Sequence, residues 1–399
     1  MANSLLPTTP PRLAPYGIYV HIPFCRMLCT YCDFVKYKGF KPRFPQYLAA
    51  LIQEAQRWPV LVPSASLYLG GGTPSALGPS LLQQLIQTLR TIFRLESTAE
   101  ISVELNPEDV TTALRDALLD AGVTRVTLGV QTWDDRALRK LGRLHTGNQA
   151  YEAIAMLQST TSLSIGLDLI YGLPNQDLAN WQQQLQKALE LEIHHLSCYA
   201  LTLEAGTPLT RHVQRGRLPM PNDDLIADMY DLTTDVLAQH GYCHYEVSNW
   251  ARPGHQSLHN SLYWNGDEYV GLGVGAVGYA SGIRWWNERL VPRYLEQIAS
   301  GQPTYTTSET IHLLERVEEL ILLQLRTSNG IDLHQFQQRT SVNLAYHTAE
   351  VIGELCSAGF LLQNNTLTVP EQHWKLLNAI TSSLIAPIRE HFTASQATS

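Results

Sequence analysis

The chain is organised around one segment near its start, which reads Tyr19-Val-His-Ile-Pro-Phe-Cys25-Arg-Met-Leu-Cys29-Thr-Tyr-Cys32-Asp-Phe34. Apolar and β-branched residues over 18–22 predict a first strand. Pro23 has no backbone N–H to give to a sheet, so it ends this strand. Three of the six cysteines then follow within eight residues. Such a concentration of thiols predicts one shared metal centre.

The spacing of these three cysteines indicates an iron–sulfur cluster with one open corner. Thiolates are the usual ligands of such clusters, and gaps of two or three residues let a short loop cover one face of a cube. Because a cubane cluster has four irons, three protein ligands leave one iron able to accept a substrate or cofactor. The segment therefore predicts chemistry at that iron.

Two other uses of the cysteines compete with the cluster. A structural zinc site would need a fourth ligand, for which the candidates are His21, Cys198, Cys243 and Cys356. Zinc ligands usually come as two separated pairs, however, and not as a compact triplet. A disulfide scaffold is disfavoured because six cysteines in 399 residues are too sparse for one.

The overall composition is that of an ordinary globular protein, with 44% hydrophobic and 16% charged residues. The formal net charge of −8 argues against nucleic acid as the main partner, because phosphate binding needs clustered Lys and Arg. Residues 1–16 contain four prolines and no basic region followed by an apolar core, which argues against a signal peptide. No stretch reaches the roughly 18 apolar residues of a spanning helix. We therefore expect a cytoplasmic protein, with peripheral membrane contact left open.

Strand and helix patterns alternate over the first 240 residues. The predicted strands cover residues 18–22, 66–69, 100–105, 125–130, 164–170 and 195–201. Helical patterns lie between them, which favours parallel strands with helical crossovers. Right-handed crossovers permit either an open, doubly wound sheet or a barrel-like arc, and periodicity does not decide between the two.

The pattern changes after residue 240, where segments rich in Tyr, Trp and Gly are expected to cover the mouth of the barrel. The region beyond these segments shows helical patterns and a hairpin. They cover residues 309–325, a shorter helix from 330, 344–358, and strands at 360–362 and 366–369 around an Asn364-Asn365 turn. Lys and Arg are few in this region, which disfavours binding in a DNA groove.

The motif Cys-x-x-x-Cys-x-x-Cys, preceded by Tyr-x-His-Ile-Pro-Phe, resembles the signature of the radical S-adenosylmethionine (SAM) superfamily, in its coproporphyrinogen III oxidase-like branch. The resemblance implies an α/β fold, an incomplete (β/α)6 radical SAM barrel with a C-terminal, mainly helical, winged-helix-like domain. The implied domains are a tail at 1–16, the partial barrel at 17–240, a barrel-covering segment at 241–303 and the winged-helix-like domain at 304–399. It also implies a [4Fe-4S] cluster held by Cys25, Cys29 and Cys32, with SAM bound at the open iron.

Polar residues that stand out in the apolar strands fall near the strands' carboxyl ends, where ligands of parallel α/β folds collect. Gly70-Gly71-Gly72-Thr73-Pro74 follows a predicted strand, and glycines let a backbone approach a ligand closely. A glycine run alone is more often a turn, and a single polar residue often serves a cap or a loop hydrogen bond. The resemblance implies SAM-binding roles for Tyr19, Gly71, Gly72, Thr73, Glu104, Gln131, Arg143 and Asp168, and a place near a second SAM for Ala200. Asp33 and Phe34 are expected to surround the cluster.

Two groups within this branch differ in ways that the sequence shows. Oxygen-independent coproporphyrinogen III oxidases continue the motif to a fourth cysteine, Cys-x-Cys, and carry a longer N-terminal tail. This chain instead has Cys32-Asp33-Phe34 and 24 residues before Cys25. Cys-Asp-Phe resembles the form found in HemW-type haem chaperones, as does His259-Asn260-Ser-Leu-Tyr263-Trp264. His259, Tyr263 and Trp264 are therefore the candidate haem-binding residues.

A neutral imidazole is a good haem-iron ligand, and Tyr and Trp rings offer flat apolar surface. The ordinary alternative is that His259 caps a loop while the aromatic rings pack into the barrel cover. We expect a haem chaperone that binds a [4Fe-4S] cluster, SAM and haem and transfers haem to acceptor proteins, with no residue assigned a catalytic role. The second interpretation is an oxidase that converts coproporphyrinogen III to protoporphyrinogen IX with SAM. The sequence does not show which protein accepts haem, whether SAM is cleaved, or whether the chain forms a homodimer.

Overall fold

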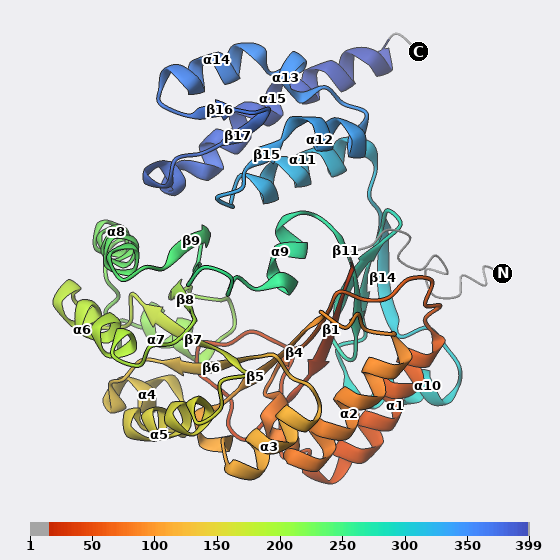
Figure 1. Cartoon of the computed structure of the whole chain (residues 1–399), viewed down its shortest axis with the longest axis vertical. Helices are drawn as coiled ribbons and strands as arrows, with labels where there is room; N and C mark the ends of the chain where they lie inside the picture. The colour runs from red at the N-terminus through yellow and green to blue at the C-terminus, as the bar shows by residue number, and fades with distance from the viewer. Residues whose placement is uncertain (1–15, 398–399) are drawn as a thin grey trace. The chain divides into compact units, whose positions relative to one another are not determined.

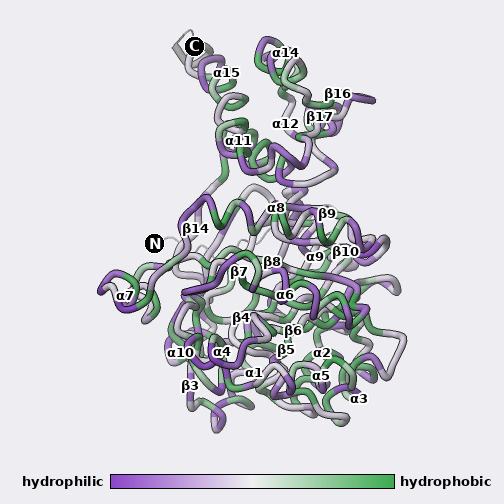
Figure 2. The backbone as a smooth tube through the Cα atoms, turned by 90° about the vertical axis from the view of Figure 1, so that its left-hand side faces the viewer, coloured by the Kyte–Doolittle hydropathy of each residue, from purple (hydrophilic) through white to green (hydrophobic). Residues whose placement is uncertain are grey.

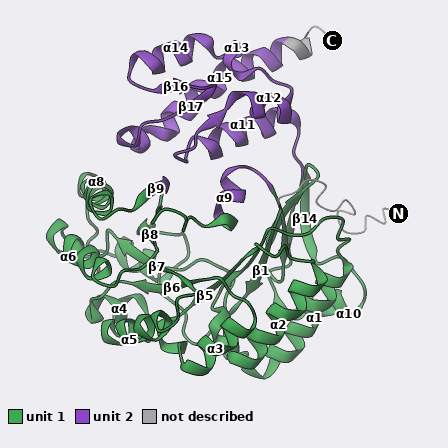
Figure 3. Ribbon diagram, viewed as in Figure 1, with its two compact units in different colours: residues 1–243, 248–259, 268–309 green, residues 244–247, 260–267, 310–399 purple. Residues whose placement is uncertain are grey.

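The computed structural model describes residues 16–397, and these divide into two compact units (Figure 3). Unit 1 comprises the described residues up to Cys243, with Ser248–His259 and Glu268–Glu309. Unit 2 comprises His244–Val247, Asn260–Asp267 and the described residues from Thr310 onward. The predicted tail, residues 1–16, lies outside the described residues except for Tyr16, and the predicted boundaries after residues 240 and 303 stay predictions. Within 16–397, no helix combines the length and the apolar character needed to cross a membrane.

Unit 1 is built on one curved sheet whose central strands are parallel (Figure 1). These strands are β1 (Tyr16–Ile22), β4 (Ser66–Gly71), β5 (Glu100–Leu105), β6 (Arg125–Gln131), β7 (Ser164–Tyr171) and β8 (His195–Ala200), each paired with the next. Beyond β1 the sheet continues with β11 (Glu268–Leu272), β12 (Val277–Ala280), β13 (Ile283–Asn287) and β14 (Tyr305–Thr310). Beyond β8 it continues with the antiparallel β10 (Asn249–Ala251). Parallel strands with helical crossovers confirm the predicted fold class.

Helices cover the outer face of this sheet (Figure 1). They are α1 (Phe44–Arg57), α2 (Pro79–Ile92), α3 (Thr112–Asp120), α4 (Asp135–Leu141), α5 (Gly147–Gln158), α6 (Leu178–Leu189), α8 (Asp223–Gln239) and α10 (Val291–Ala299), while the short α7 (Pro208–Gln214) follows β8. Their starts are specified locally. Asp134 accepts hydrogen bonds from the backbone N–H groups of Arg136 and Ala137, and Thr146 forms a capping box with Gln149. Each such cap is worth about 1 kcal/mol.

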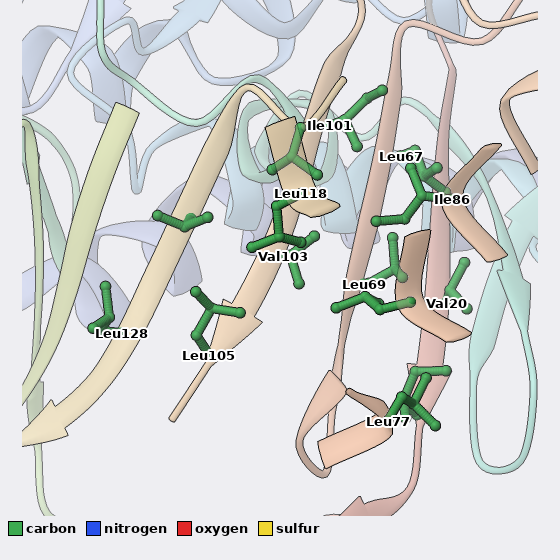
Figure 4. Packing of buried hydrophobic residues seen from close by; sticks show 14 of the residues in the cluster. Val20, Leu67, Leu69, Leu77, Ile86, Ile101, Val103, Leu105, Leu118 and Leu128 are labelled. Atoms are coloured by element: carbon green, nitrogen blue, oxygen red, sulfur yellow. The ribbon is translucent and has the colours of Figure 1, made fainter. Parts of the chain in front are cut away.

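The core of unit 1 lies between the strands and the helices, because strand side chains alternate between two faces. One face of β4 and β5 is apolar and packs against α2 and α3 (Figure 4). Its labelled members are Leu67, Leu69, Ile101, Val103 and Leu105, with Ile86 from α2 and Leu118 from α3. The residues between them on the same strands, such as Tyr68 and Glu104, belong to the opposite face. That alternation delivers polar groups to the concave side of the sheet.

Unit 2 is mainly helical and carries a small sheet with the order β15-β17-β16. Its elements are α11 (Leu313–Gln324), β15 (Ile331–Asp332), α12 (Leu333–Thr340), α13 (Leu344–His347), α14 (Ala349–Ser357), β16 (Leu361–Gln363), β17 (Thr366–Thr368) and α15 (Leu377–Ala397). The hairpin is confirmed, with positive φ at Asn364 and Asn365 in its turn. Hydrophilic and hydrophobic colours alternate along the helices of both units, as expected of helices that bury one side (Figure 2). Two further elements, β9 (Cys243–Glu246) and α9 (Leu258–Trp264), include residues of both units.

Two predicted helix limits in this region are wrong. The helix expected from residue 309 begins at Leu313, because His312 and Glu315 form a capping box there and residues up to Thr310 belong to β14. The helix expected over 344–358 is divided into α13 and α14 at Thr348. The buried Thr348 hydroxyl donates to the carbonyl oxygen of Leu344 at 2.8 Å, and this local bond competes with a continuous helix.

Candidate iron–sulfur and cofactor site

A cavity of about 510 Å³ lies at the carboxyl ends of the parallel strands in unit 1. Its walls come from the cysteine loop, from the carboxyl-terminal parts of β4, β5, β6, β7 and β8, and from segments that follow these strands. Eleven of the predicted cluster and SAM residues line it: Cys25, Cys29, Cys32, Gly71, Gly72, Thr73, Glu104, Gln131, Arg143, Asp168 and Ala200. Asp33 and Phe34 line it as well. The sheet topology therefore brings together residues that are spread over 176 positions of the sequence (25 to 200, counted inclusively).

The cysteine loop is held at both of its ends and in its middle. At the ends, β2 (Phe24–Cys25) pairs in parallel with β3 (Tyr37–Lys38). In the middle, the backbone N–H of Thr30 donates to the carbonyl oxygen of Leu141 at 2.9 Å, and its carbonyl oxygen accepts from the N–H of Leu209 at 2.9 Å. These bonds fix the loop to the end of α4 and the start of α7.

The three thiols lie at the cavity with polar neighbours. The hydroxyl of Thr73 lies 3.5 Å from Cys25 Sγ, and Arg143 Nη1 lies 3.6 Å from Cys29 Sγ. Burial raises the pKa of the Cys25 thiol to about 11, so this group is neutral at pH 7 until a metal ion displaces its proton. Three thiols at one cavity, with two polar donors directed at their sulfurs, fit a [4Fe-4S] cluster ligated at three irons.

His21, the nearest alternative ligand in sequence, is already engaged through both ring nitrogens. Its Nδ1 lies 3.1 Å from the Tyr19 hydroxyl, and its Nε2 lies 2.8 Å from the carbonyl oxygen of Val35. The ring is buried, and burial lowers its pKa to about 4. These contacts give His21 the role of supporting the loop between Cys32 and β3.

Glycine is required at two positions of the cavity wall. Gly71 has φ +105°, and a methyl group at this position would overlap the ring of His21. A methyl group at Gly72 would lie 2.7 Å from the carbonyl carbon of Pro23. The segment after β4 therefore packs its backbone directly against the segment after β1. A cofactor can approach this backbone because no side chain intervenes.

Glu104 ties this backbone to the inner face of β4. Its Oε2 accepts from the N–H of Gly71 at 3.2 Å, and its Oε1 accepts from the Tyr68 hydroxyl at 2.8 Å. Tyr19 stacks on Tyr68 with a centroid separation of 6.2 Å and does not line the cavity. Tyr19 thus contacts Tyr68 on the sheet face that carries the cavity, and its predicted SAM contact stays a prediction.

Arg143 connects three parts of the wall. Its Nη2 donates to Gly129 O at 2.6 Å and to Asn106 Oδ1 at 2.8 Å, while its Nε is buried without a hydrogen-bond partner among residues 16–397. An unsatisfied donor on a cationic group suits an anionic ligand such as the carboxylate of SAM. Gln131 beside it has φ +68° at an irregularity of the β6–β7 ladder, which turns the end of β6 at the cavity.

Asn106 is a cavity residue that the sequence prediction missed. Its amide nitrogen donates to Thr73 Oγ1 at 3.3 Å, and its amide oxygen accepts from Arg143. Asn106 therefore links the two side chains that contact cysteine sulfurs. The sequence does contain a signal for this role, because Asn106 directly follows β5 as Gly72 directly follows β4.

Two partly exposed carboxyl groups, Asp168 and Glu104, line the same cavity. Burial, and secondarily the charge of Glu104, raises the pKa of Asp168 from its ordinary 3.8 to about 7, although Ser197 and Arg143 act in the opposite direction. Burial also raises the pKa of Glu104. The folded chain thus binds more protons than the unfolded chain between pH 4 and 7, so this pair lowers stability as pH rises through that window.

SAM affinity is expected to fall as pH drops below about 7. SAM carries a positive sulfonium group, which an ionised Asp168 attracts and a protonated one does not. Equilibrium dialysis of cluster-loaded protein at pH 6 and pH 8 measures this, with up to about tenfold weaker binding expected at the lower pH. Asp168→Asn should bind SAM weakly with little difference between the two pH values. An equal pH dependence in both proteins would assign the effect to another group.

His259 packs against the amino-terminal ends of β1, β4 and β5, opposite the strand ends that form the cavity. Its ring is 1% exposed, stacks on Tyr68 at 5.0 Å, and lies with Nδ1 2.7 Å from Ser66 Oγ. Its backbone N–H donates to Glu100 at 3.1 Å. Haem ligation by His259 would require the ring to leave Ser66 and Tyr68. The haem-binding roles of His259, Tyr263 and Trp264 stay predictions.

Comparison with known proteins identifies families for both parts of the chain. A model of the Radical SAM superfamily matches residues 19–187, and a model of the HemN C-terminal domain matches residues 311–373. The protein named Heme chaperone HemW from Lactococcus lactis is 37% identical over 347 residues, which are 87% of this chain and 91% of that protein. The protein of the same name from Bacillus subtilis is 33% identical over 90% of this chain and 96% of its own length.

The solved structure of coproporphyrinogen III oxidase (HemN) from Escherichia coli has the same fold, with a TM-score of 0.79 over 93% of this chain and 90% of that chain. Its sequence identity is 23%, so this likeness concerns the fold alone. The curated relatives extend over nearly the whole chain at higher identity. From the radical SAM match, the cysteine cavity and these relatives, we conclude that the chain belongs to the HemW family of radical SAM proteins.

Proposed function

We propose that the protein is a haem chaperone that holds a [4Fe-4S] cluster and SAM and passes haem to acceptor proteins. The observation that carries this proposal is the 37% identity to a protein named Heme chaperone HemW over 91% of that protein's length. The cavity of the present chain contains the three thiols that the cluster needs. Cys25, Cys29 and Cys32 would each bind one iron, which leaves one iron for SAM.

The other cavity residues would bind and orient SAM. Gly71 and Gly72 leave their backbone accessible, and Arg143 Nε offers a donor for a carboxylate. Glu104 and Asp168 offer negative charge to the sulfonium and amino groups. When bound, the cluster supplies one-electron chemistry at an iron with an open coordination position. The residues of the cavity wall would hold SAM at the side of the three thiols.

Phe34 argues against the alternative function of a coproporphyrinogen III oxidase. It stands two residues after Cys32, where the oxidase motif has its fourth cysteine, and its side chain is 64% exposed at the cavity. A phenyl ring supplies no thiolate. The change leaves the three cluster cysteines intact, so it bears on the reaction and not on cluster binding.

Anaerobic incubation with reductant, SAM and coproporphyrinogen III tests this choice. A haem chaperone should form no protoporphyrinogen IX, and the same preparation should bind haem with a defined stoichiometry in a Soret titration. Turnover of coproporphyrinogen III would refute the chaperone proposal, and so would the absence of haem binding. Homodimer formation, peripheral membrane contact and a cytoplasmic location stay predictions, of which sedimentation with and without the cluster tests the first.

A further inference from the structure

A second pocket of about 340 Å³ lies within unit 1, at the start of the cysteine loop and the segment that follows the loop. Aromatic rings form much of its wall. Phe24 packs on Phe44 with a centroid separation of 4.4 Å and stacks on Phe40 at 6.2 Å, and Tyr37 meets Phe40 edge-on at 4.9 Å. Phe24 and Phe44 are buried, whereas Phe40 and Tyr37 are partly exposed. A flat apolar molecule can therefore pack against rings that are already fixed.

The charged side chains that line this pocket all carry positive charge. They are Arg26, Lys38 and Lys41, and none of the lining residues that the structure describes is acidic. Arg26 is already paired with Asp109 at 2.7 Å. Among residues 16–397, Lys38 Nζ has only the weak acceptor Met27 Sδ, at 3.4 Å. Lys38 and Lys41 are exposed at the rim. Two ammonium groups above an aromatic wall suit a flat ligand with carboxylate groups on one edge.

This concentration of lysine is unusual for the chain. The sequence contains six lysines and a net charge of −8, yet Lys38 and Lys41 both lie at this pocket. Lys36, also close in sequence, belongs to the SAM cavity and donates to the carbonyl oxygen of Cys32. Random placement in an acidic chain does not favour such a group. The walled shape of the pocket favours a small molecule over a flat protein surface as the ligand.

The pocket also touches the cluster site directly. Cys25 lines both cavities, and β2 and β3, which carry Phe24 and Tyr37, pair at the ends of the cysteine loop. A ligand in this pocket lies next to a sulfur that would bind the cluster. Binding here would therefore alter the surroundings of that sulfur.

We propose that this pocket binds the propionate-bearing edge of the haem cargo, with the propionates at Lys38 and Lys41 and the macrocycle against Phe40 and Tyr37. The inference rests on the proposed haem-carrying function. The volume holds an edge of the porphyrin and leaves the rest accessible for transfer to an acceptor. His259 packs near Gly17 at the start of β1, whereas Phe24 lies just beyond the end of β1. At 3.3 Å per strand residue, Gly17 and Phe24 are roughly 20 Å apart. The proposed pocket is therefore distinct from a haem site at His259.

Haem titration of cluster-reconstituted full-length protein tests the proposal, with the Soret band as the readout. The double variant Lys38→Glu/Lys41→Glu should bind haem at least about tenfold more weakly than the wild type. The matched control Lys140→Glu/Lys187→Glu changes two exposed lysines outside the pocket and should bind within about twofold of the wild type. His259→Ala tests the competing position, because its ring lies at the other end of β1. Loss of haem affinity in His259→Ala together with unchanged affinity in the lysine double variant would assign haem to His259 and overturn the pocket.

A modified ligand tests the same contacts in the wild-type protein, so that misfolding of a variant cannot explain the result. Haem dimethyl ester, whose propionates carry no charge, should bind the wild type at least about tenfold more weakly than haem. This preference for haem should be lost or reversed in the lysine double variant, because its two glutamates repel the propionates and not the esters. The electron paramagnetic resonance spectrum of the reduced cluster should change when haem binds to the wild type. If the lysine variant and the wild type bound haem with equal affinity, the proposal that this pocket binds haem would be wrong. The proposed chaperone function would not be affected. A wild type that binds no haem would overturn both.

Discussion

Cys29→Ala is expected to lose the cluster: after anaerobic reconstitution the variant should hold less than about a tenth of the iron and sulfide of the wild type. Cys29 Sγ lies at the cavity with Arg143 Nη1 at 3.6 Å, and with Cys25 and Cys32 it completes the set of three thiols. Two thiols would hold a cubane along one edge and leave two irons without protein ligands. Substitution of an outer-shell partner alone typically costs 10–100-fold in metal affinity, so loss of a ligand should cost at least as much.

The matched controls for Cys29→Ala are the other cysteines of the chain. Cys243→Ala removes an exposed thiol and Cys356→Ala a partly buried one, and neither residue lines the cavity. Both variants should keep the iron and sulfide content of the wild type. Circular dichroism should be unchanged in all three variants, because Cys29 lies in a loop. If Cys29→Ala kept its full iron and sulfide content, the ligand set would be wrong.

Gly71→Ala is expected to weaken SAM binding by at least about tenfold and to destabilise the fold by about 1–3 kcal/mol. Gly71 has φ +105°, a conformation that alanine adopts only under strain, and the new methyl group would overlap the His21 ring. His21 cannot move without loss of its bonds to Tyr19 and Val35. Displacement of Gly71 would also disturb its N–H bond to Glu104.

Gly206→Ala separates backbone strain from the clash at the cavity. Gly206 also has positive φ, +80°, but a methyl group there meets nothing within 4 Å, and the residue lines neither pocket. This control should lose less stability than Gly71→Ala, because no clash adds to the backbone strain, and it should keep the SAM affinity of the wild type. Urea unfolding gives the stability, and equilibrium dialysis gives the affinity. Unchanged SAM binding in Gly71→Ala would show that this backbone does not form the SAM site.

The cluster loop and most of the cavity could be predicted from the sequence because their signals are local. Thr73, Glu104 and Asp168 are polar residues in or just after apolar strands, and the ends of parallel strands meet at one edge whatever the details of packing. The role of Asn106 could not be predicted, since it depends on Arg143 and Thr73, each more than 30 positions away. The turn at Gln131 likewise depends on the pairing of β6 with β7.

His259 shows how a local pattern differs from a position in the fold. Its sequence neighbours Tyr263 and Trp264 suggest a haem-binding group, but its environment is set by Ser66, Tyr68 and Glu100. Those contacts join positions more than 150 residues apart. The aromatic and basic pocket beside Cys25 is a different case, because nine of its ten lining residues lie between positions 24 and 44. What the sequence does not show is that β2 pairs with β3, which brings Phe24 beside Tyr37.

The central claim is that Cys25, Cys29 and Cys32 hold a cubane cluster with one iron open to SAM. The most direct test is the iron and acid-labile sulfide content of protein purified without oxygen, measured together with zinc. We expect about four irons and four sulfides per chain and no stoichiometric zinc. One zinc per chain without sulfide would contradict this claim.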